Sequence, residues 1–158
     1  MAVPGVYLAG PSGFTEPGRR WHADVLRPAV ENAGFDALDP WEVGADLFDA
    51  ALAMADGPDR MVALAHANRE AARRNVELIR RAAVVLALLD GIDVDSGTAA
   101  EIGYAAALGT PVVGLRTDTR LCGDNAAARV NLQVEFFLAS VCTDVDAAIA
   151  ELRRLAST

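Results

Sequence analysis

Residues 82–101, AAVVLALLDGIDVDSGTAAE, decide the fold of this chain. The apolar run at 82–89 has the length of a strand, and an unbroken run of this kind is typical of a central parallel strand covered on both faces. A short acidic segment containing glycine follows, and it leads into a helix predicted over 98–108. After Gly109-Thr110-Pro111, a second apolar strand predicted at 112–115 completes a βαβ unit.

The remaining sequence continues this alternation on both sides. Thr15 is the expected N-cap of a first helix, Gly34 ends it, and Pro28 is expected to kink it. The loop at 10–13 contains too much glycine and proline for us to expect a helix there. Upstream, the predicted elements are a strand at 3–9, a helix at 17–33, a strand at 35–38, a loosely helical stretch at 43–55 and a helix at 59–81.

Downstream of the βαβ unit the pattern is weaker. A polar loop is expected at 116–129, the stretch 131–138 fits a helix or a strand, and a short strand is expected at 141–142. Thr143 or Asp144 is the expected cap of a last helix that ends near 155. We therefore predict one α/β domain over 1–158, with a doubly wound, flavodoxin-like, mostly parallel sheet of five strands and helices on both faces.

The composition excludes several functions. All 14 basic residues are arginine, so lysine-dependent phosphate loops and Schiff-base chemistry are ruled out. With 22 acidic residues the net charge is −8, which disfavours nucleic acid and anionic membranes as partners. No signal-peptide pattern or membrane-length apolar run is present, so a cytoplasmic protein is expected. The two cysteines and two histidines lack metal-ligand spacing, and we expect no metal site.

Ligands of such sheets bind beyond the carboxyl ends of the strands, which directs attention to the loops AGPSGF (9–14) and DGIDVDSGTAAE (90–101). The second loop does not have the spacing of a calcium-binding loop. Thr98 and Glu101 fit a capping box, in which the glutamate only closes the start of a helix. The position of Glu101 at the expected crevice also fits a nucleophilic carboxylate, with neighbouring aspartates accepting hydrogen bonds from sugar hydroxyls.

Four segments of the sequence resemble the nucleoside 2-deoxyribosyltransferase family. They are VYLAGPSGFTEPGRRW (6–21), RRNVELIRRAAVVLALLDG (73–91), DSGTAAEIGYAAALGTPVVGLRTD (95–118) and RVNLQ (129–133). The resemblance implies transfer of 2-deoxyribose between nucleobases by double displacement, without a cofactor. The implied partners are deoxynucleosides and free nucleobases.

The resemblance also implies roles for individual residues. Glu101 is the expected nucleophile that forms a covalent deoxyribosyl intermediate, Tyr7 orients it, and Asp95 accepts a sugar hydroxyl. Asn131 and Gln133 lie on a segment that in relatives completes the site of a neighbouring subunit, which implies a homo-oligomer. Further candidates for substrate binding are Gly10, Phe14, Trp41, Asn75, Asp90, Ser96 and Gly97.

Several of these assignments have alternatives. Tyr7, Phe14 and Trp41 also fit simple core positions. Asn75 stands where many relatives have an aspartate that handles the departing base, and an amide cannot ionise, although it can still hydrogen-bond to a base. The alternative activities are hydrolysis of nucleosides or nucleoside 5′-monophosphates, for which arginines such as Arg116 and Arg120 could supply charge, and nucleotide sensing without catalysis.

Overall fold

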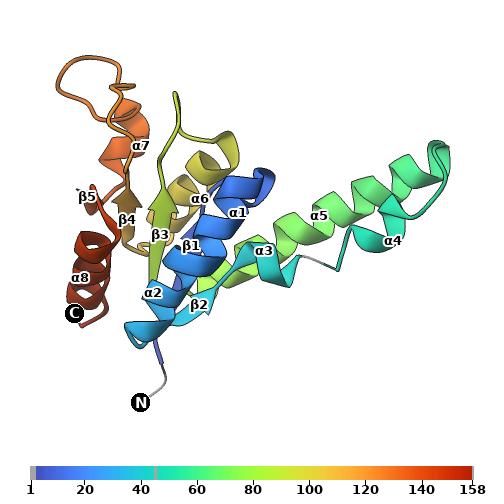
Figure 1. Cartoon of the computed structure of the whole chain (residues 1–158), viewed down its shortest axis with the longest axis horizontal. Coiled ribbons are helices and arrows are strands. Elements are labelled where there is room, and N and C mark those ends of the chain that lie inside the picture. Colours follow the sequence, from blue (N-terminus) through green and yellow to red (C-terminus); the bar gives the residue numbers. More distant parts are fainter. Residues whose placement is uncertain (1–2, 45, 158) are drawn as a thin grey trace.

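The computed structural model describes residues 3–44 and 46–157, in which five parallel strands form one sheet between two layers of helices (Figure 1). The strand order β2-β1-β3-β4-β5 is that of flavodoxin-like folds, so the predicted fold class is confirmed. The sheet is entirely parallel within the described residues. Its strands are β1 (Gly5–Ala9), β2 (Asp36–Leu38), β3 (Val84–Leu88), β4 (Val112–Leu115) and β5 (Ser140–Cys142).

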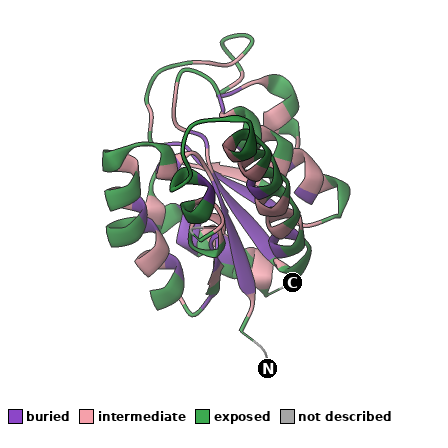
Figure 2. Ribbon diagram, turned by 90° about the vertical axis from the view of Figure 1, so that its right-hand side faces the viewer, coloured by how far each residue is buried: buried purple, intermediate pink, exposed green. Residues whose placement is uncertain are grey.

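Alternating side chains of the strands supply two separate apolar cores. Val6 and Leu8 of β1 pack on the face covered by α2 (Arg27–Asn32) and α8 (Val145–Ala156). Tyr7 and Ala9 point to the opposite face, which is covered by α5 (Pro58–Arg81) and α6 (Ser96–Ala107). The central strands are therefore buried on both sides, as the purple ribbons in Figure 2 show.

The first helical region begins and ends where its sequence predicts. Thr15 caps α1 (Glu16–Trp21) by accepting a hydrogen bond from the Gly18 amide at 3.2 Å. A π-helical turn at His22–Leu26 joins α1 to α2, and Pro28 is the second residue of α2. The irregularity expected from this proline therefore lies in the turn just before it. One expectation is wrong: Ser12–Phe14 forms a short 3-10 turn, because its tight geometry tolerates the glycine and proline that disfavour a longer helix.

In the described part of the stretch predicted as loosely helical at 43–55, only the last residue of one single-turn helix and the whole of a second one are helical. The two helices are α3 (Pro40–Val43) and α4 (Asp49–Leu52), and position 45 of this stretch lies outside the described residues. The long helix α5 begins at Pro58 and ends at Arg81, close to the prediction. Its first half extends past the edge of the sheet, and α4 packs along this part (Figure 1).

The start of α6 differs from the capping-box interpretation. Asp95 is the N-cap, and its carboxylate accepts hydrogen bonds from the Thr98 amide at 3.0 Å and the Thr98 hydroxyl at 3.2 Å. Glu101 consequently lies in the second turn of α6, not in the first, and is free of a capping role.

Near the end of the chain, the structure decides between the alternatives that the sequence left open. The stretch 131–138 contains a helix and not a strand, because α7 (Leu132–Phe136) follows Asn131, whose side chain caps it. Asp144 rather than Thr143 caps α8.

Candidate active site

The candidate site lies where the strand order of the sheet reverses. From the adjacent strands β1 and β3 the chain leaves toward opposite faces, so the loops that follow them diverge and open a crevice at their carboxyl ends. The first loop carries Gly10 and Phe14, and the second leads through Asp95 into α6. The two loops selected from the sequence therefore meet at one edge of the sheet.

Glu101 is held by side chains from two other elements. The Tyr7 hydroxyl on β1 donates to Oε1 of Glu101 at 2.6 Å. The Asn75 amide on α5 donates to the same oxygen at 3.4 Å. Among the described residues no hydrogen bond reaches Oε2, so one oxygen of the carboxylate is fixed and the other is available to a ligand.

The surroundings of Glu101 make it a weaker acid than an exposed glutamate. Burial is the main cause that raises its pKa to about 7, and the negative charge of Asp95 adds to this effect. Hydrogen bonds from Tyr7 and Asn75 act in the opposite direction. The pKa of Tyr7 is raised by burial and by the charge of Glu101, so the tyrosine stays protonated and acts as a donor.

A cavity of about 430 Å³ opens in front of Glu101. This volume falls in the range of small-molecule sites. Its walls include two carboxylates and two amides, and no arginine side chain among the residues that the structure describes. The lining residues are Gly10, Phe14, Pro40, Trp41, Gly44, Phe48, Asn68, Ala71, Asn75, Asp95, Gly97, Thr98 and Glu101.

One wall of this cavity is aromatic. Phe14 and Trp41 meet edge to face, with ring centroids 4.8 Å apart. The Trp41 indole donates to the Gly10 carbonyl at 3.2 Å, which ties α3 to the loop after β1. The indole lies so close to Gly13 that a Cβ there would be 2.2 Å from the ring. Phe14 is 72% exposed, so the interpretation of Phe14 as a core residue is wrong.

A buried contact between a histidine and an aspartate supports this wall. Asp39 caps α3 by accepting from the Trp41 amide at 2.9 Å, and its other oxygen contacts His22 Nε2 at 2.7 Å. Both side chains are almost fully buried. Burial raises the pKa of Asp39, but the contact with His22, the Trp41 amide and the charge of Arg27 together lower it, so the carboxylate remains charged and holds the first turn of α3.

Four predicted binding residues lie outside this cavity. Asp90 accepts hydrogen bonds from the Thr117 amide and hydroxyl and from the Asp118 amide, so it joins the loops after β3 and β4. Ser96 is exposed at the start of α6. Asn131 caps α7, and Gln133 is exposed in that helix. Within one chain, the structure does not bring these residues to Glu101.

The structure also adds residues that the sequence analysis missed. Asn68 lies on α5 seven residues before Asn75, which the sequence analysis did select. Both side chains line the cavity, and this spacing is a signal that could have been read from the sequence. Phe48 reaches the cavity from the segment between α3 and α4. Its position depends on how this segment folds back over α5, and no sequence motif indicates that path.

Two classes of feature are not found in the described part of the chain. No group of three or more histidine, cysteine, aspartate or glutamate side chains is arranged to hold a metal ion there. No helix in this part combines the length and the apolar character that a membrane span requires.

The structure is a doubly wound α/β protein with a cavity lined by two carboxylates, two amides and an aromatic wall. The chain belongs to the nucleoside 2-deoxyribosyltransferase family, whose profile matches residues 6–133. The expected family is therefore confirmed.

Individual proteins share sequence or fold with this chain. An uncharacterised protein of Schizosaccharomyces pombe is 32% identical over 123 residues, covering 75% of this chain and 53% of the relative, so the chain spans about half the length of that relative. A 2-deoxyribosyltransferase from Leishmania mexicana has a similar structure (TM-score 0.67, 24% identity, 96% of this chain and 97% of the other). A CMP N-glycosidase from Clostridium botulinum is also similar in fold (TM-score 0.52, 16% identity, 94% and 98% covered).

Proposed function

We propose that this protein transfers 2-deoxyribose from a deoxynucleoside to a free nucleobase through a covalent intermediate on Glu101. The observation that carries the proposal is the arrangement of Glu101, with Oε1 held by Tyr7 and Asn75 and Oε2 without a partner at the wall of the cavity. A carboxylate fixed in this way is oriented for attack, because its binding partners restrict its rotation.

In the first step, Oε2 of Glu101 bonds to C1′ of the deoxyribose as the C1′–N glycosidic bond breaks. The electron pair of that bond leaves with the base. A nitrogen of a second base then attacks C1′ from the opposite side, and the carboxylate is released. Each step inverts C1′, so the product retains the original configuration. The absence of a 2′-hydroxyl favours the oxocarbenium-like transition state, which the negative charge of Glu101 stabilises.

The other polar side chains suit the sugar and the base. Asp95 uses one oxygen to cap α6, and its second oxygen is free of hydrogen bonds among the described residues, so it can accept one from a sugar hydroxyl. Asn68 and Asn75 place amides along α5, where they can bond to base edges. Asn75 cannot protonate the departing base, so we assign that proton to water or to another acid.

The aromatic wall suits a flat ligand. Phe14, Trp41 and Phe48 line the cavity, and their rings offer apolar surface to a nucleobase. The described lining residues include no arginine, and the carboxylates of Asp95 and Glu101 repel a phosphate. Both features favour a free nucleoside over a nucleoside 5′-monophosphate.

The second candidate activity is hydrolysis of the N-glycosidic bond. If water rather than a base attacks the intermediate, the same residues release free deoxyribose, and the fold shared with a CMP N-glycosidase gives this alternative a basis. A sensing role without catalysis is the third candidate, and in that case Glu101 would bind a nucleoside without reacting.

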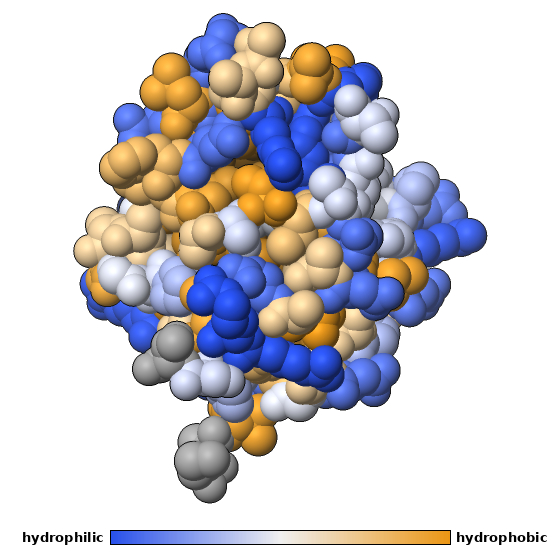
Figure 3. Space-filling view, turned by 90° about the vertical axis from the view of Figure 1, so that its left-hand side faces the viewer, coloured by the Kyte–Doolittle hydropathy of each residue, from blue (hydrophilic) through white to orange (hydrophobic). Residues whose placement is uncertain are grey.

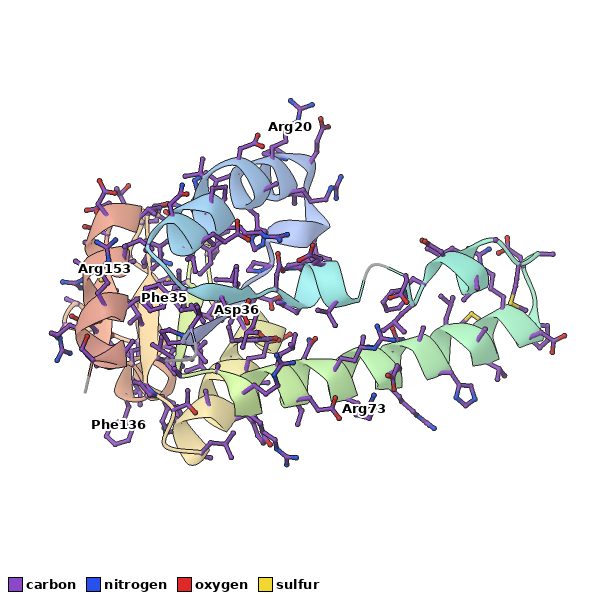
Figure 4. The ribbon with its side chains drawn as sticks, turned by 90° about the horizontal axis from the view of Figure 1, so that it is seen from below. Arg20, Phe35, Asp36, Arg73, Phe136 and Arg153 are labelled. Atoms are coloured by element: carbon purple, nitrogen blue, oxygen red, sulfur yellow. The ribbon has the colours of Figure 1, made fainter. Side chains whose placement is uncertain are left out.

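We also propose that the active form is a homo-oligomer. Leu132 and Phe136 on α7 are 57% and 79% exposed, and Phe136 projects from the surface (Figure 4). The side of the molecule with α7, β5 and α8 has a hydrophobic patch in its upper half (Figure 3). Such a surface suits contact with a second copy. Asn131, at the start of α7, would then reach a neighbouring site.

The test is incubation with deoxyinosine, with and without free adenine, followed by chromatography of nucleosides and bases. Deoxyadenosine formed only when adenine is present supports transfer. Hypoxanthine released at the same rate without an acceptor supports hydrolysis, and no turnover of deoxyinosine or of other deoxynucleosides contradicts both enzymatic proposals.

A second experiment locates the nucleophile. Mass spectrometry of quenched protein is expected to find a deoxyribosyl adduct on the peptide that contains Glu101. Glu101→Ala should abolish both the adduct and the exchange. Glu16→Gln, which removes an exposed carboxylate on α1, serves as the control and should keep both.

A further inference from the structure

A second cavity lies beyond the carboxyl ends of β4 and β5, and it shares no lining residue with the cavity in front of Glu101. Its volume is about 190 Å³, which is below the range of sites for drug-sized molecules and suits a small ion. Most of its wall is the loop after β4. The polar side chains of the wall are Arg116, Asp118, Thr119, Arg120, Arg129 and Thr143.

This cavity is positively charged in a protein of net charge −8. Three arginines line it together with a single aspartate. Arg120 forms an ion pair with Asp118, so these two charges largely cancel. In the described part of the chain, neither Arg116 nor Arg129 has a carboxylate within ion-pair distance.

Arg116 is unusual because its charge is buried, with 6% of the residue exposed. Its guanidinium donates to three backbone carbonyls, those of Leu89 at 2.5 Å, Gly91 at 3.3 Å and Arg120 at 2.7 Å. These carbonyls fix the guanidinium, but they carry no net charge. Buried charges in proteins are usually paired with an opposite charge, so an anion would complement Arg116 here.

The rest of the wall supplies further donors. The Arg129 guanidinium is held by the Val141 carbonyl at 3.1 Å, which leaves its other N–H groups for a ligand. The hydroxyls of Thr119 and Thr143 have no hydrogen-bond partner among the described residues. Two charged groups held in place by carbonyls, together with two free hydroxyls, match the several acceptor oxygens of a tetrahedral oxyanion.

We propose that this cavity binds a small phosphate-type oxyanion, either inorganic phosphate or the phosphate group of a small monoester. The ion neutralises Arg116 and Arg129 and accepts hydrogen bonds from the threonine hydroxyls. Because Arg116 also holds the carbonyls of Leu89 and Gly91, the bound ion stabilises the start of the loop that leads to Asp95. This inference is independent of the reaction proposed for Glu101.

The test is isothermal titration calorimetry of the whole chain with inorganic phosphate at constant ionic strength. We expect one site per chain, and at least tenfold weaker binding in Arg129→Gln and in Thr143→Val. Arg153→Gln removes the same charge near the end of α8 and should leave the affinity unchanged. Absence of measurable binding at 10 mM phosphate, or equal weakening by Arg129→Gln and Arg153→Gln, would overturn the proposal.

Two further titrations distinguish free phosphate from a phosphate monoester, and this cavity from the cavity in front of Glu101. A titration with 2-deoxyribose 5-phosphate shows whether a monoester binds better than the free ion, and dependence on Arg129 in either case supports the site. Glu101→Gln should retain phosphate binding. Loss of binding in Glu101→Gln would place the phosphate in the other cavity and contradict the inference.

Discussion

At the residue scale, the burial that makes the Glu101 carboxylate reactive also lowers the stability of the folded protein. Burial raises the pKa of its carboxyl to about 7, because the charged form loses hydration there. Tyr7 and Asn75 recover part of this loss by donating to Oε1. The carboxylate is thus less solvated than on a surface and is still largely ionised slightly above neutral pH, which is the state that a nucleophile needs.

The first prediction concerns Tyr7→Phe. This change removes a hydrogen bond that favours the ionised form of Glu101, so the pKa of that carboxyl should rise further. Hydrogen bonds to charged groups contribute about 1.5–3 kcal/mol, so kcat/KM at pH 7 should fall roughly ten- to a hundredfold. For the unmodified protein, kcat/KM should increase with pH through about 7, and the variant should need a higher pH.

This prediction is checked by the pH dependence of kcat/KM. A variant that loses activity equally at every pH would indicate misplacement of Glu101 without a change in its ionisation, contrary to the hydrogen-bond argument.

The second prediction concerns the stability of Glu101→Gln. The pKa of Glu101 is higher in the folded state than in the unfolded state, so folding takes up a proton and the ionised carboxylate opposes folding as pH rises. Glutamine keeps an acceptor for Tyr7 and has no charge. The variant should therefore be more stable by on the order of 1–3 kcal/mol above pH 8, with the gain shrinking as pH falls toward 4.5.

Urea unfolding at pH 8.5 and pH 4.5 measures this difference. The result to expect is a gain confined to the higher pH. An equal gain at both values would show that packing, and not ionisation, separates the two proteins.

At the element scale, the loop after β1 and the short helix α3 form one structural unit. The Trp41 indole bonds to Gly10 and covers Gly13, while the Asp39–His22 pair fixes the first turn of α3. Neither segment has enough regular structure to be rigid alone. The contacts between them hold the aromatic wall at the cavity.

The third prediction follows from the close approach of Trp41 to Gly13. Gly13→Ala places a methyl group 2.2 Å from the indole, so the ring must move. We expect a loss of about 1–3 kcal/mol in stability and a several-fold higher KM for the base, with a smaller change in kcat. Gly57→Ala is the matched control, because a Cβ there meets no atom within 4 Å.

Steady-state kinetics with varied acceptor base, together with thermal unfolding, test this prediction. An unchanged KM in a clearly destabilised Gly13→Ala protein would mean that the aromatic wall does not contact the base.

At the scale of the whole molecule, a single chain leaves Asn131 outside the cavity. Leu132 and Phe136 form an apolar surface on α7 next to it. Within the described residues, the cavity is walled by the loops after β1 and β3 and by α3, α5 and α6. The proposed oligomer would bring an amide to this cavity from outside the chain.

The fourth prediction is that Phe136→Glu weakens the oligomer, because it places a charge in an apolar contact. Sedimentation velocity should show a smaller species and the exchange activity should fall at least tenfold. Val3→Glu, at another exposed apolar position, should change neither quantity.

Mixing two inactive variants tests the role of Asn131 itself. Glu101→Ala and Asn131→Ala, combined and reassembled, should recover part of the activity if Asn131 acts on a neighbouring site. No recovery despite mixed assembly would show that both residues act within one chain.

Much of the fold could be predicted because its signals are local. The apolar run at 82–89 and the glycine-bounded helices indicate a parallel sheet, since such runs are buried on both faces. Tyr7 and Glu101 could be selected because the carboxyl ends of parallel strands meet at one edge. The cap of α6 was predicted wrongly, because Thr98 and Asp95 both fit a cap, and only the backbone geometry at Asp95 separates them.

The sequence by itself determined the flavodoxin-like fold class, the two loops that form the site and the family to which the chain belongs. Only the tertiary structure decided that Asp90 joins two loops, that Phe48 and Asn68 line the cavity, and that the buried Arg116 has no acidic partner among the described residues. The physical reason is that periodicity and capping are properties of neighbouring residues, whereas burial and long-range hydrogen bonds depend on which distant segments pack together.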